Sequence, residues 1–239
     1  FLPHFETRTT SKLGLFLNLL VSFLFMTNHY VVAPTSGQYS ALLGQSEAMS
    51  GMIIGLSPSA AFISGAVYSY WTNTSFKQPM LAAVTLLVVG NLLYAMALQC
   101  DSYVMLFLGR FLCGLGAPRG VARRYISDHV ETIHRTVASS HFVSASALGL
   151  AFGPLLSVMI TLANLSYSVK ANDVVLVKFT PVTAPGWIMF ILWIITWFAV
   201  LIGFTEPLTT TDRERSDTLF GAVMKAVNGA YIRVNSGWN

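Results

Sequence analysis

Charged side chains are scarce in this sequence. Only 10% of its 239 residues are Asp, Glu, Lys or Arg, whereas 54% are hydrophobic. A typical soluble domain carries about 25% charged residues, so this chain has too few to cover a surface that faces water. A disordered chain is excluded as well, because such chains are rich in charge and poor in aromatic residues. The composition therefore predicts a polytopic membrane protein, all-α in class.

Cysteines and catalytic motifs are also few or absent. The two cysteines, Cys100 and Cys113, exclude a disulfide framework and a cysteine-based zinc site. The sequence has no glycine-rich phosphate loop, no HExxH motif and no nucleophile elbow. The basic pair Arg123 and Arg124 is far too small a patch for nucleic acid. We therefore expect no enzyme activity, no cofactor, no metal site and no nucleic-acid partner.

What the sequence does contain is a series of long apolar runs. A helix of about 20 apolar residues crosses the hydrocarbon core of a bilayer. Six such runs cover residues 13–33, 48–70, 80–98, 103–123, 137–162 and 187–204. They predict a cytosolic segment, a six-helix transmembrane bundle and a cytosolic linker or tail, at residues 1–12, 13–206 and 207–239.

Two features refine this architecture. Gly55-Leu-Ser-Pro58 in the second run resembles Gly149-Leu-Ala-Phe-Gly-Pro154 in the fifth, since both place small residues and a proline inside a span. That repetition predicts two three-helix repeats, a plan used by many transporters. The stretch Asp173–Thr180, in the long connection between the fifth and sixth runs, is compatible with a short strand or hairpin.

The distribution of positive charge predicts the orientation. Ten of the 14 lysines and arginines lie on one side of the six runs, and only Lys170 and Lys178 lie on the other. Lysine and arginine accumulate in cytoplasmic loops. Both chain ends are therefore expected in the cytosol, which agrees with an even number of crossings.

Arginine inside a predicted span is the strongest chemical signal. Arg110 lies well within the fourth run and Arg119 further along it, whereas all ten acidic residues lie in predicted loops, tails or span ends. An arginine at mid-membrane costs roughly 2.5–3.5 kcal/mol on insertion scales. Two interpretations stay open: Arg110 binds backbone carbonyls and joins helices, or its unpaired charge receives an anion. Guanidinium groups match the geometry of phosphate and carboxylate, so an anionic substrate is favoured over a cationic one.

Helical spacing divides the basic residues of this run into two pairs. On one continuous helix, Arg124 returns to within about 40° of the face of Arg110, while Arg119 and Arg123 share another face. One pair would line a pathway, and the other would contact neighbouring helices or lipid headgroups. In the first run, Asn28 and Tyr30 belong to a polar patch that we expect to face the interior.

Several motifs resemble those of the major facilitator superfamily. Arg110-Phe-Leu-Cys-Gly114-Leu-Gly116 resembles its fourth-helix RxxxGxG motif, and Gly149–Pro154 resembles its fifth-helix GxxxGP motif. The loop Thr72–Pro79 is similar to a degraded form of the GxxxDRxGRR loop, in which Asn73 replaces the acidic residue. The resemblance implies half of a major facilitator fold.

A closer resemblance is to the membrane half of the SPX-MFS family of vacuolar phosphate transporters. It rests on Met26–Thr35, Gly90–Ala95 and above all Arg119–Asp128. It implies phosphate movement across the vacuolar membrane under control of a cytosolic SPX domain. The sequence itself contains neither an SPX domain nor a second set of six spans, and a lysosomal relative in the superfamily shares much of the pattern.

Two functional hypotheses follow. The first is an alternating-access transporter for inorganic phosphate or a similar small anion in a vacuolar or lysosomal membrane, completed by a missing C-terminal half or by partner subunits. The second is a non-transporting six-helix structural subunit of a larger membrane assembly. In the first, Arg110 attracts the anion midway and Arg124 and Tyr125 line the cytosolic entrance. The candidate substrate-binding residues are Arg110, Arg124, Tyr125, Asn28, Tyr30, Arg119 and Arg123.

Overall fold

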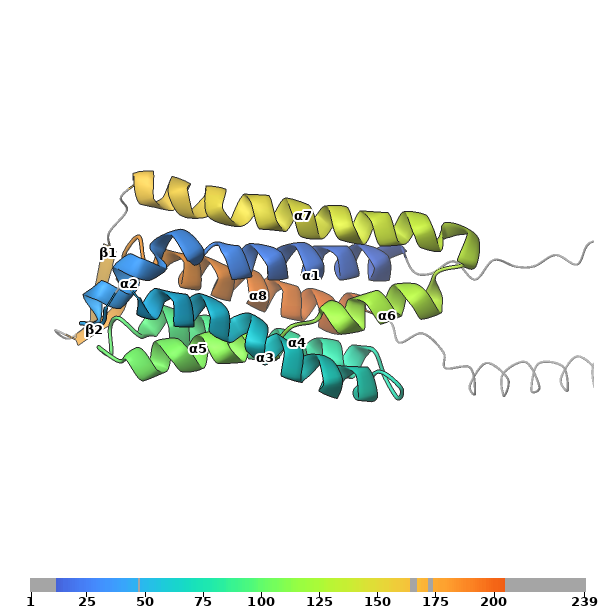
Figure 1. Ribbon diagram of the computed structural model, residues 1–239, viewed down its shortest axis with the longest axis horizontal. Coiled ribbons are helices and arrows are strands. Elements are labelled where there is room, and N and C mark those ends of the chain that lie inside the picture. The colour runs from blue at the N-terminus through green and yellow to red at the C-terminus, as the bar shows by residue number, and fades with distance from the viewer. Residues whose placement is uncertain (1–11, 47, 164–166, 172–173, 205–239) are drawn as a thin grey trace, which may run out of the picture. The chain divides into compact units, whose positions relative to one another are not determined.

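The computed structural model describes residues 12–46, 48–163, 167–171 and 174–204 (Figure 1). The terminal segments expected at residues 1–12 and 207–239 lie outside this part of the chain, apart from Lys12. Within the described residues, six helical spans are long and apolar enough to cross a membrane. The predicted six-helix architecture is therefore confirmed.

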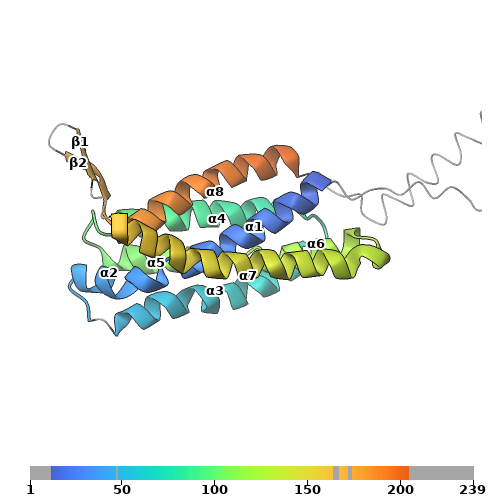
Figure 2. The same cartoon turned by 90° about the horizontal axis from the view of Figure 1, so that it is seen from above.

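The elements follow one another along the chain in the order expected for six crossings, and successive spans run in opposite directions (Figures 1 and 2). The first span comprises α1 (Lys12–Tyr30), the short 3-10 helix η1 (Ala33–Thr35) and α2 (Ser36–Leu42). The others are α3 (Met49–Trp71), α4 (Lys77–Met96), α5 (Tyr103–Leu115) with α6 (Arg119–His129), α7 (Thr132–Ala163) and α8 (Ala184–Gly203).

The fourth span is not one continuous helix, which corrects an assumption of the helical-spacing argument. Helix α5 ends at Leu115 and α6 begins at Arg119, with Gly116, Ala117 and Pro118 between them. Proline has no backbone N–H to donate and its ring clashes with the preceding turn. The regular rotation of side chains is therefore interrupted between Arg110 and the three arginines of α6.

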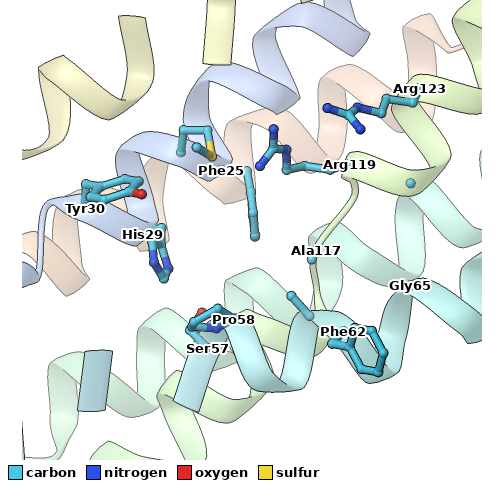
Figure 3. A pocket seen from close by; sticks show the side chains of 13 residues that line it. Phe25, His29, Tyr30, Ser57, Pro58, Phe62, Gly65, Ala117, Arg119 and Arg123 are labelled. Atoms are coloured by element: carbon cyan, nitrogen blue, oxygen red, sulfur yellow. The ribbon is translucent and has the colours of Figure 1, made fainter. Parts of the chain in front are cut away.

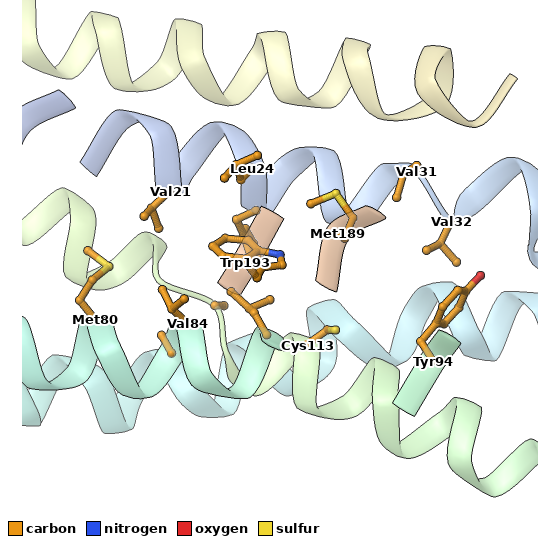
Figure 4. Packing of buried hydrophobic residues seen from close by; sticks show 14 of the residues in the cluster. Val21, Leu24, Val31, Val32, Met80, Val84, Tyr94, Cys113, Met189 and Trp193 are labelled. Atoms are coloured by element: carbon orange, nitrogen blue, oxygen red, sulfur yellow. The ribbon is translucent and has the colours of Figure 1, made fainter. Parts of the chain in front are cut away.

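The bundle is held together around α1, α4 and α8. Helix α1 packs against α7 and α8, α4 packs against α5 and α8, and α3 packs against α5. Figure 4 shows Trp193 of α8 between Val21 and Leu24 of α1 on one side and Val84 of α4 on the other, and all four are buried. These contacts form the apolar core that fixes the helices relative to one another.

Helices α3 and α7 are peripheral. Both carry large apolar side chains on their surface, such as Ile63, which is 56% exposed, and Leu162, which is 80% exposed. Such an exposed apolar surface suits the hydrocarbon of a bilayer, where it has no contact with water. This surface explains how a chain so poor in charge is accommodated.

Helix α7 lies close to α1 because of the glycines in its GxxxGP motif. A Cβ atom at Gly149 would collide with the carbonyl oxygen of Phe23, and one at Gly153 would lie 2.9 Å from the Cβ of Tyr30. Small residues allow such close approach of helix backbones in membrane proteins. The motif therefore has a packing role between α7 and α1.

Two strands connect α7 to α8. Strand β1 (Tyr167–Ala171) pairs antiparallel with β2 (Val174–Phe179), with Tyr167 opposite Phe179 and an irregularity between Val169 and Lys170. The hairpin lies at the end of the bundle opposite the α6–α7 connection (Figure 1). The stretch expected to form a short strand or hairpin thus contains only the second strand, and β1 precedes it. The hairpin is the one β element among the described residues.

Candidate functional site

A cavity of about 520 Å³ lies between α1, α3 and the start of α6 (Figure 3). Helix α1 contributes polar and aromatic side chains to it, and α3 contributes mainly small and apolar ones. The lining residues are Phe25, Met26, His29, Tyr30, Ser57, Pro58, Ala61, Phe62, Gly65, Ala117, Arg119, Gly120 and Arg123.

The break in the fourth span places two arginines in this cavity. Because α6 begins at Arg119, this residue and Arg123 lie one turn apart on the same face of the helix, and Figure 3 shows both at the cavity. Within the described chain, neither forms a hydrogen bond or an ion pair with another residue. Like charges four residues apart on a helix repel each other, so the pair is unfavourable in the absence of a negative partner.

No negative side chain balances these arginines. Of the acidic residues that the structure describes, Asp101, Asp128 and Glu131, none lines the cavity. The first turn of α6 also carries backbone N–H groups without helical partners, and the helix dipole is positive at this end. The cavity is thus positively charged by side chains and by backbone together.

Arg110 occupies a different position, inside the bundle. Its side chain is 1% exposed and does not line the cavity. Nη1 donates one long hydrogen bond, of 3.5 Å, to the carbonyl oxygen of Asn28, while Nε and Nη2 have no partner. Asn28 is buried beside it, and the next residues in α1, His29 and Tyr30, do reach the cavity. Arg110 is therefore close to the site but separated from its open volume in this conformation.

Arg124 faces away from the cavity and its donors are occupied. Nη1 donates to the carbonyl oxygen of Ser69 at 2.8 Å and to Oγ1 of Thr72 at 2.9 Å. Nη2 donates to Oδ1 of Asn73 at 2.6 Å, and Nε lies 3.3 Å from Oδ2 of Asp128. Arg124 thus caps the C-terminal end of α3, where a cation is favoured by the helix dipole.

Tyr125 is likewise outside the cavity. It is buried in an aromatic cluster, stacked on His129 at 5.0 Å between ring centroids and packed against Phe76 at 6.0 Å and Phe204 at 5.1 Å. This cluster joins α6 to the ends of α4 and α8. Of the two expected pairs, Arg119 and Arg123 stay together and line the cavity. Arg110 and Arg124 are apart, because Arg110 is buried in the bundle and Arg124 is bonded to the end of α3.

Other polar residues of the first span divide in the same way. Asn18 donates through Nδ2 to the carbonyl oxygen of Ala122 at 3.0 Å and so joins α1 to α6. His29, by contrast, lines the cavity. In the sequence it stands between Asn28 and Tyr30 of the polar patch in the first run, but the pattern alone did not distinguish it from these neighbours.

Arg123 makes one notable contact, with an aromatic ring on α7. Its Cζ lies 5.6 Å from the centroid of the Phe142 ring, and Phe142 is buried. A cation over the face of an aromatic ring is stabilised by about 0.5–2 kcal/mol. Phe142 thus holds the guanidinium of Arg123 at the edge of the cavity.

This contact leads to a first prediction, for the binding of an oxyanion such as sulfate in the cavity. Phe142→Leu keeps an apolar side chain but removes the ring, so we expect the Kd for sulfate to rise about 3-fold, the loss of roughly 0.7 kcal/mol. In an Arg123→Gln background the same substitution should have no further effect. Equal effects in both backgrounds would contradict the positioning role.

Comparison with known proteins identifies the fold. Residues 18–234 match the family described as Major Facilitator Superfamily. The chain belongs to this superfamily. The resemblance noted in its fourth- and fifth-helix motifs is thereby confirmed, and the six spans form half of a major facilitator fold.

Relatives with similar sequences are SPX domain-containing membrane proteins. One from Arabidopsis thaliana is 40% identical over 195 residues, which cover 82% of this chain and 27% of that protein. One from Oryza sativa subsp. japonica is 42% identical over 195 residues, again 82% of this chain and 27% of the relative. The chain thus spans little more than a quarter of the length of these relatives.

Solved structures with a similar fold are transporters. A mutant of the peptide transporter POT in complex with sulfate superposes with a TM-score of 0.61 and 16% identity, over 95% of this chain and 47% of that one. The same transporter in complex with alafosfalin gives a TM-score of 0.58, also at 16% identity, over 91% and 46% of the two chains. These likenesses concern the fold alone.

Proposed function

We propose that this chain forms the anion-binding half of a carrier that moves inorganic phosphate, or a similar small anion, across an organelle membrane by alternating access. The observation that carries this proposal is the cavity lined by Arg119 and Arg123, which have no negative partner in the described chain. Arg119 is only partly exposed, and a cation without a partner is costly in such a position. An anion that enters the cavity relieves this cost.

The geometry suggests two successive positions for the anion. At the first, Arg119 and Arg123 bind its oxygens and the hydroxyl of Tyr30 donates to it from α1. At the second, deeper in the bundle, the free Nε and Nη2 atoms of Arg110 receive it beside Asn28. Arg110 becomes accessible when this half rocks against the rest of the carrier.

Arg124 and Tyr125 have a different part in the same proposal. In the conformation described, the two residues contact the ends of α3, α4 and α8. In the opposite state of the carrier these contacts separate, and the two residues then line the entrance. Both chain ends are on the cytosolic side in this scheme, because the basic residues of α6 and α7 lie at that end.

A vacuolar or lysosomal membrane is the proposed location. This location is what the resemblance of Arg119–Asp128 to the SPX-MFS family implies, and the relatives carry an SPX domain by name. Control by such a domain and completion by a second half or by partner subunits belong to the same proposal. A structural subunit without transport is the competing hypothesis, and the experiment below separates the two.

The test is a flux measurement on the natural protein that carries this chain, purified and reconstituted into vesicles. Uptake of phosphate, sulfate and chloride is compared, and we expect the oxyanions to be preferred over chloride. Arg119→Gln should lower phosphate uptake at subsaturating concentration about 30-fold, as expected for loss of one charge-assisted hydrogen bond of roughly 2 kcal/mol.

The matched control is Lys178→Gln, which removes the same charge at the hairpin end of the bundle, where the residue is exposed. Its uptake should equal that of the unmodified protein. No uptake of any of the three anions by the unmodified protein would overturn the carrier hypothesis and favour a structural subunit. Equal losses in both variants would show a general effect of charge rather than binding in the cavity.

A further inference from the structure

His29 is the one residue in the cavity whose charge can change near neutral pH. Of the other lining residues, arginine stays protonated, and a tyrosine hydroxyl ionises only near pH 10. No carboxylate of the described chain lines the cavity. Histidine, by contrast, exchanges a proton between about pH 5 and 8. Any proton carried through this cavity by a side chain therefore has one candidate.

The ring of His29 is available for that exchange. It lies edge-on to Tyr30, with 4.9 Å between ring centroids, and makes no hydrogen bond to another residue in the described part of the chain. Figure 3 shows the ring extending from α1 toward the space between α1 and α3. Its nitrogens are thus free to meet water or a solute in the cavity.

The charged groups around His29 are all positive. Arg110 of α5 and Arg119 of α6 are close enough to act on it electrostatically, and Arg123 lies on the same face of α6 as Arg119. The lining residues from α3 are not titratable, and Tyr30 is neutral near pH 7. The described chain therefore surrounds His29 with positive charge and places no negative charge in the cavity.

A bound anion reverses this balance. A doubly charged oxyanion between Arg119 and His29 offsets the neighbouring positive charge and can accept a hydrogen bond from an imidazolium N–H. Anion binding then favours protonation of His29, and by linkage protonation of His29 strengthens anion binding by the same factor. The two binding events are therefore coupled through charge alone.

We infer that His29 takes up one proton with each anion, so that the carrier moves the anion together with a proton. This inference rests on the proposed function. The proton comes from water on the side where the anion enters, resides on a ring nitrogen of His29 while the anion is bound, and returns to water on the side of release. No bond other than the N–H bond forms or breaks, and no oxidant or further reactant is needed.

Sulfate is the suitable probe, because its charge stays constant across the range in which histidine titrates, whereas that of phosphate does not. The natural protein is reconstituted into vesicles that contain a fluorescent pH indicator. An inward sulfate gradient should acidify the lumen, and sulfate uptake at subsaturating concentration should fall about 10-fold as the external pH rises from about 5 to 8.

In His29→Gln the acidification should disappear, and uptake at low pH should fall to the value that the unmodified protein shows at high pH. His141→Gln is the matched control, since His141 is exposed on α7 and does not line the cavity. It should retain both acidification and pH dependence. His29→Asn, measured in parallel and checked by size-exclusion chromatography, provides a second variant if the first does not fold.

The outcomes separate the two proposals. Sulfate or phosphate uptake by the unmodified protein without lumenal acidification overturns proton coupling and leaves the carrier hypothesis standing, whether or not the variants fold. Acidification that persists in folded His29→Gln assigns the proton to another group and likewise overturns the inference. Absence of uptake of every anion tested overturns the proposed function itself, and the inference with it.

Discussion

Replacing Arg110 by methionine is expected to lower anion flux by about 100-fold or more without reducing the thermal stability of the protein. The flux loss corresponds to roughly 3 kcal/mol, the upper value for one hydrogen bond to a charged group. Stability should be kept because the guanidinium is 1% exposed, makes a single 3.5 Å hydrogen bond and leaves Nε and Nη2 unpaired. Methionine fills the space without burying a charge.

The alternative role for Arg110, as a tie between α5 and α1, predicts the opposite pair of results. If the bond to the Asn28 carbonyl holds the helices together, methionine will lower the unfolding temperature and leave flux per folded molecule unchanged. Both quantities are measured on the natural protein in vesicles and in detergent. Arg110→Lys serves as a control, because it keeps the charge but loses the planar fork, and an intermediate flux is expected.

The spans were predictable because a transmembrane helix is specified locally. A run of about 20 apolar residues is sufficient to cross the bilayer, and backbone groups in hydrocarbon must be satisfied within the segment. The predicted run 48–70 became α3, Met49–Trp71, and the run 187–204 became α8, Ala184–Gly203. Differences of a few residues arise at the ends, where helices leave the apolar run and continue into polar sequence.

The candidate site was predicted less well, and the reason is the break in the fourth span. The expected faces assumed one continuous helix from Arg110 to Arg124. Gly116, Ala117 and Pro118 lie between these two residues. Those residues end α5 and restart the helix as α6, so the face that carries Arg119 turns to the cavity. Proline and glycine were visible in the sequence as interruption signals. The direction in which α6 restarts depends on its contacts with α1, α3 and α7, which no local pattern specifies.

His29 and Phe142 illustrate the same limit. His29 lines the same cavity as Arg119, and Phe142 contacts Arg123, but each belongs to a different helix from its arginine. Only the packing of α1 and α7 around α6 brings them together. The RxxxGxG motif, in contrast, correctly indicated a close helix contact, because small residues have few other uses inside a membrane span. Local sequence thus specified which segments pack closely, while the tertiary arrangement decided which charges share a cavity.

Gly114→Ala should destabilise the protein strongly for so small a change, because this glycine is where α5 meets α3. A Cβ atom at Gly114 would collide with the carbonyl oxygen of Ser57 and lie 2.7 Å from the Cβ of Ala60. Because the nearest atom is a backbone oxygen of α3, no flexible side chain can move aside, and α3 itself must shift. Overpacking of this kind costs about 1–3 kcal/mol.

Gly55→Ala is the matched control, since it makes the same chemical change on α3 at a position with nothing within 4 Å of the added carbon. Alanine favours the helix over glycine, so this variant should be as stable as the unmodified protein or more so, by up to about 1 kcal/mol. Unfolding is followed by size-exclusion chromatography of the detergent-solubilised natural protein after heating. Similar unfolding temperatures for the two variants would show that α3 and α5 are not held in contact at Gly114.

The same substitution should also affect transport, because α3 forms one wall of the cavity. At temperatures where Gly114→Ala is still folded, its anion flux should be lower than that of the unmodified protein. Gly55→Ala should not share this effect.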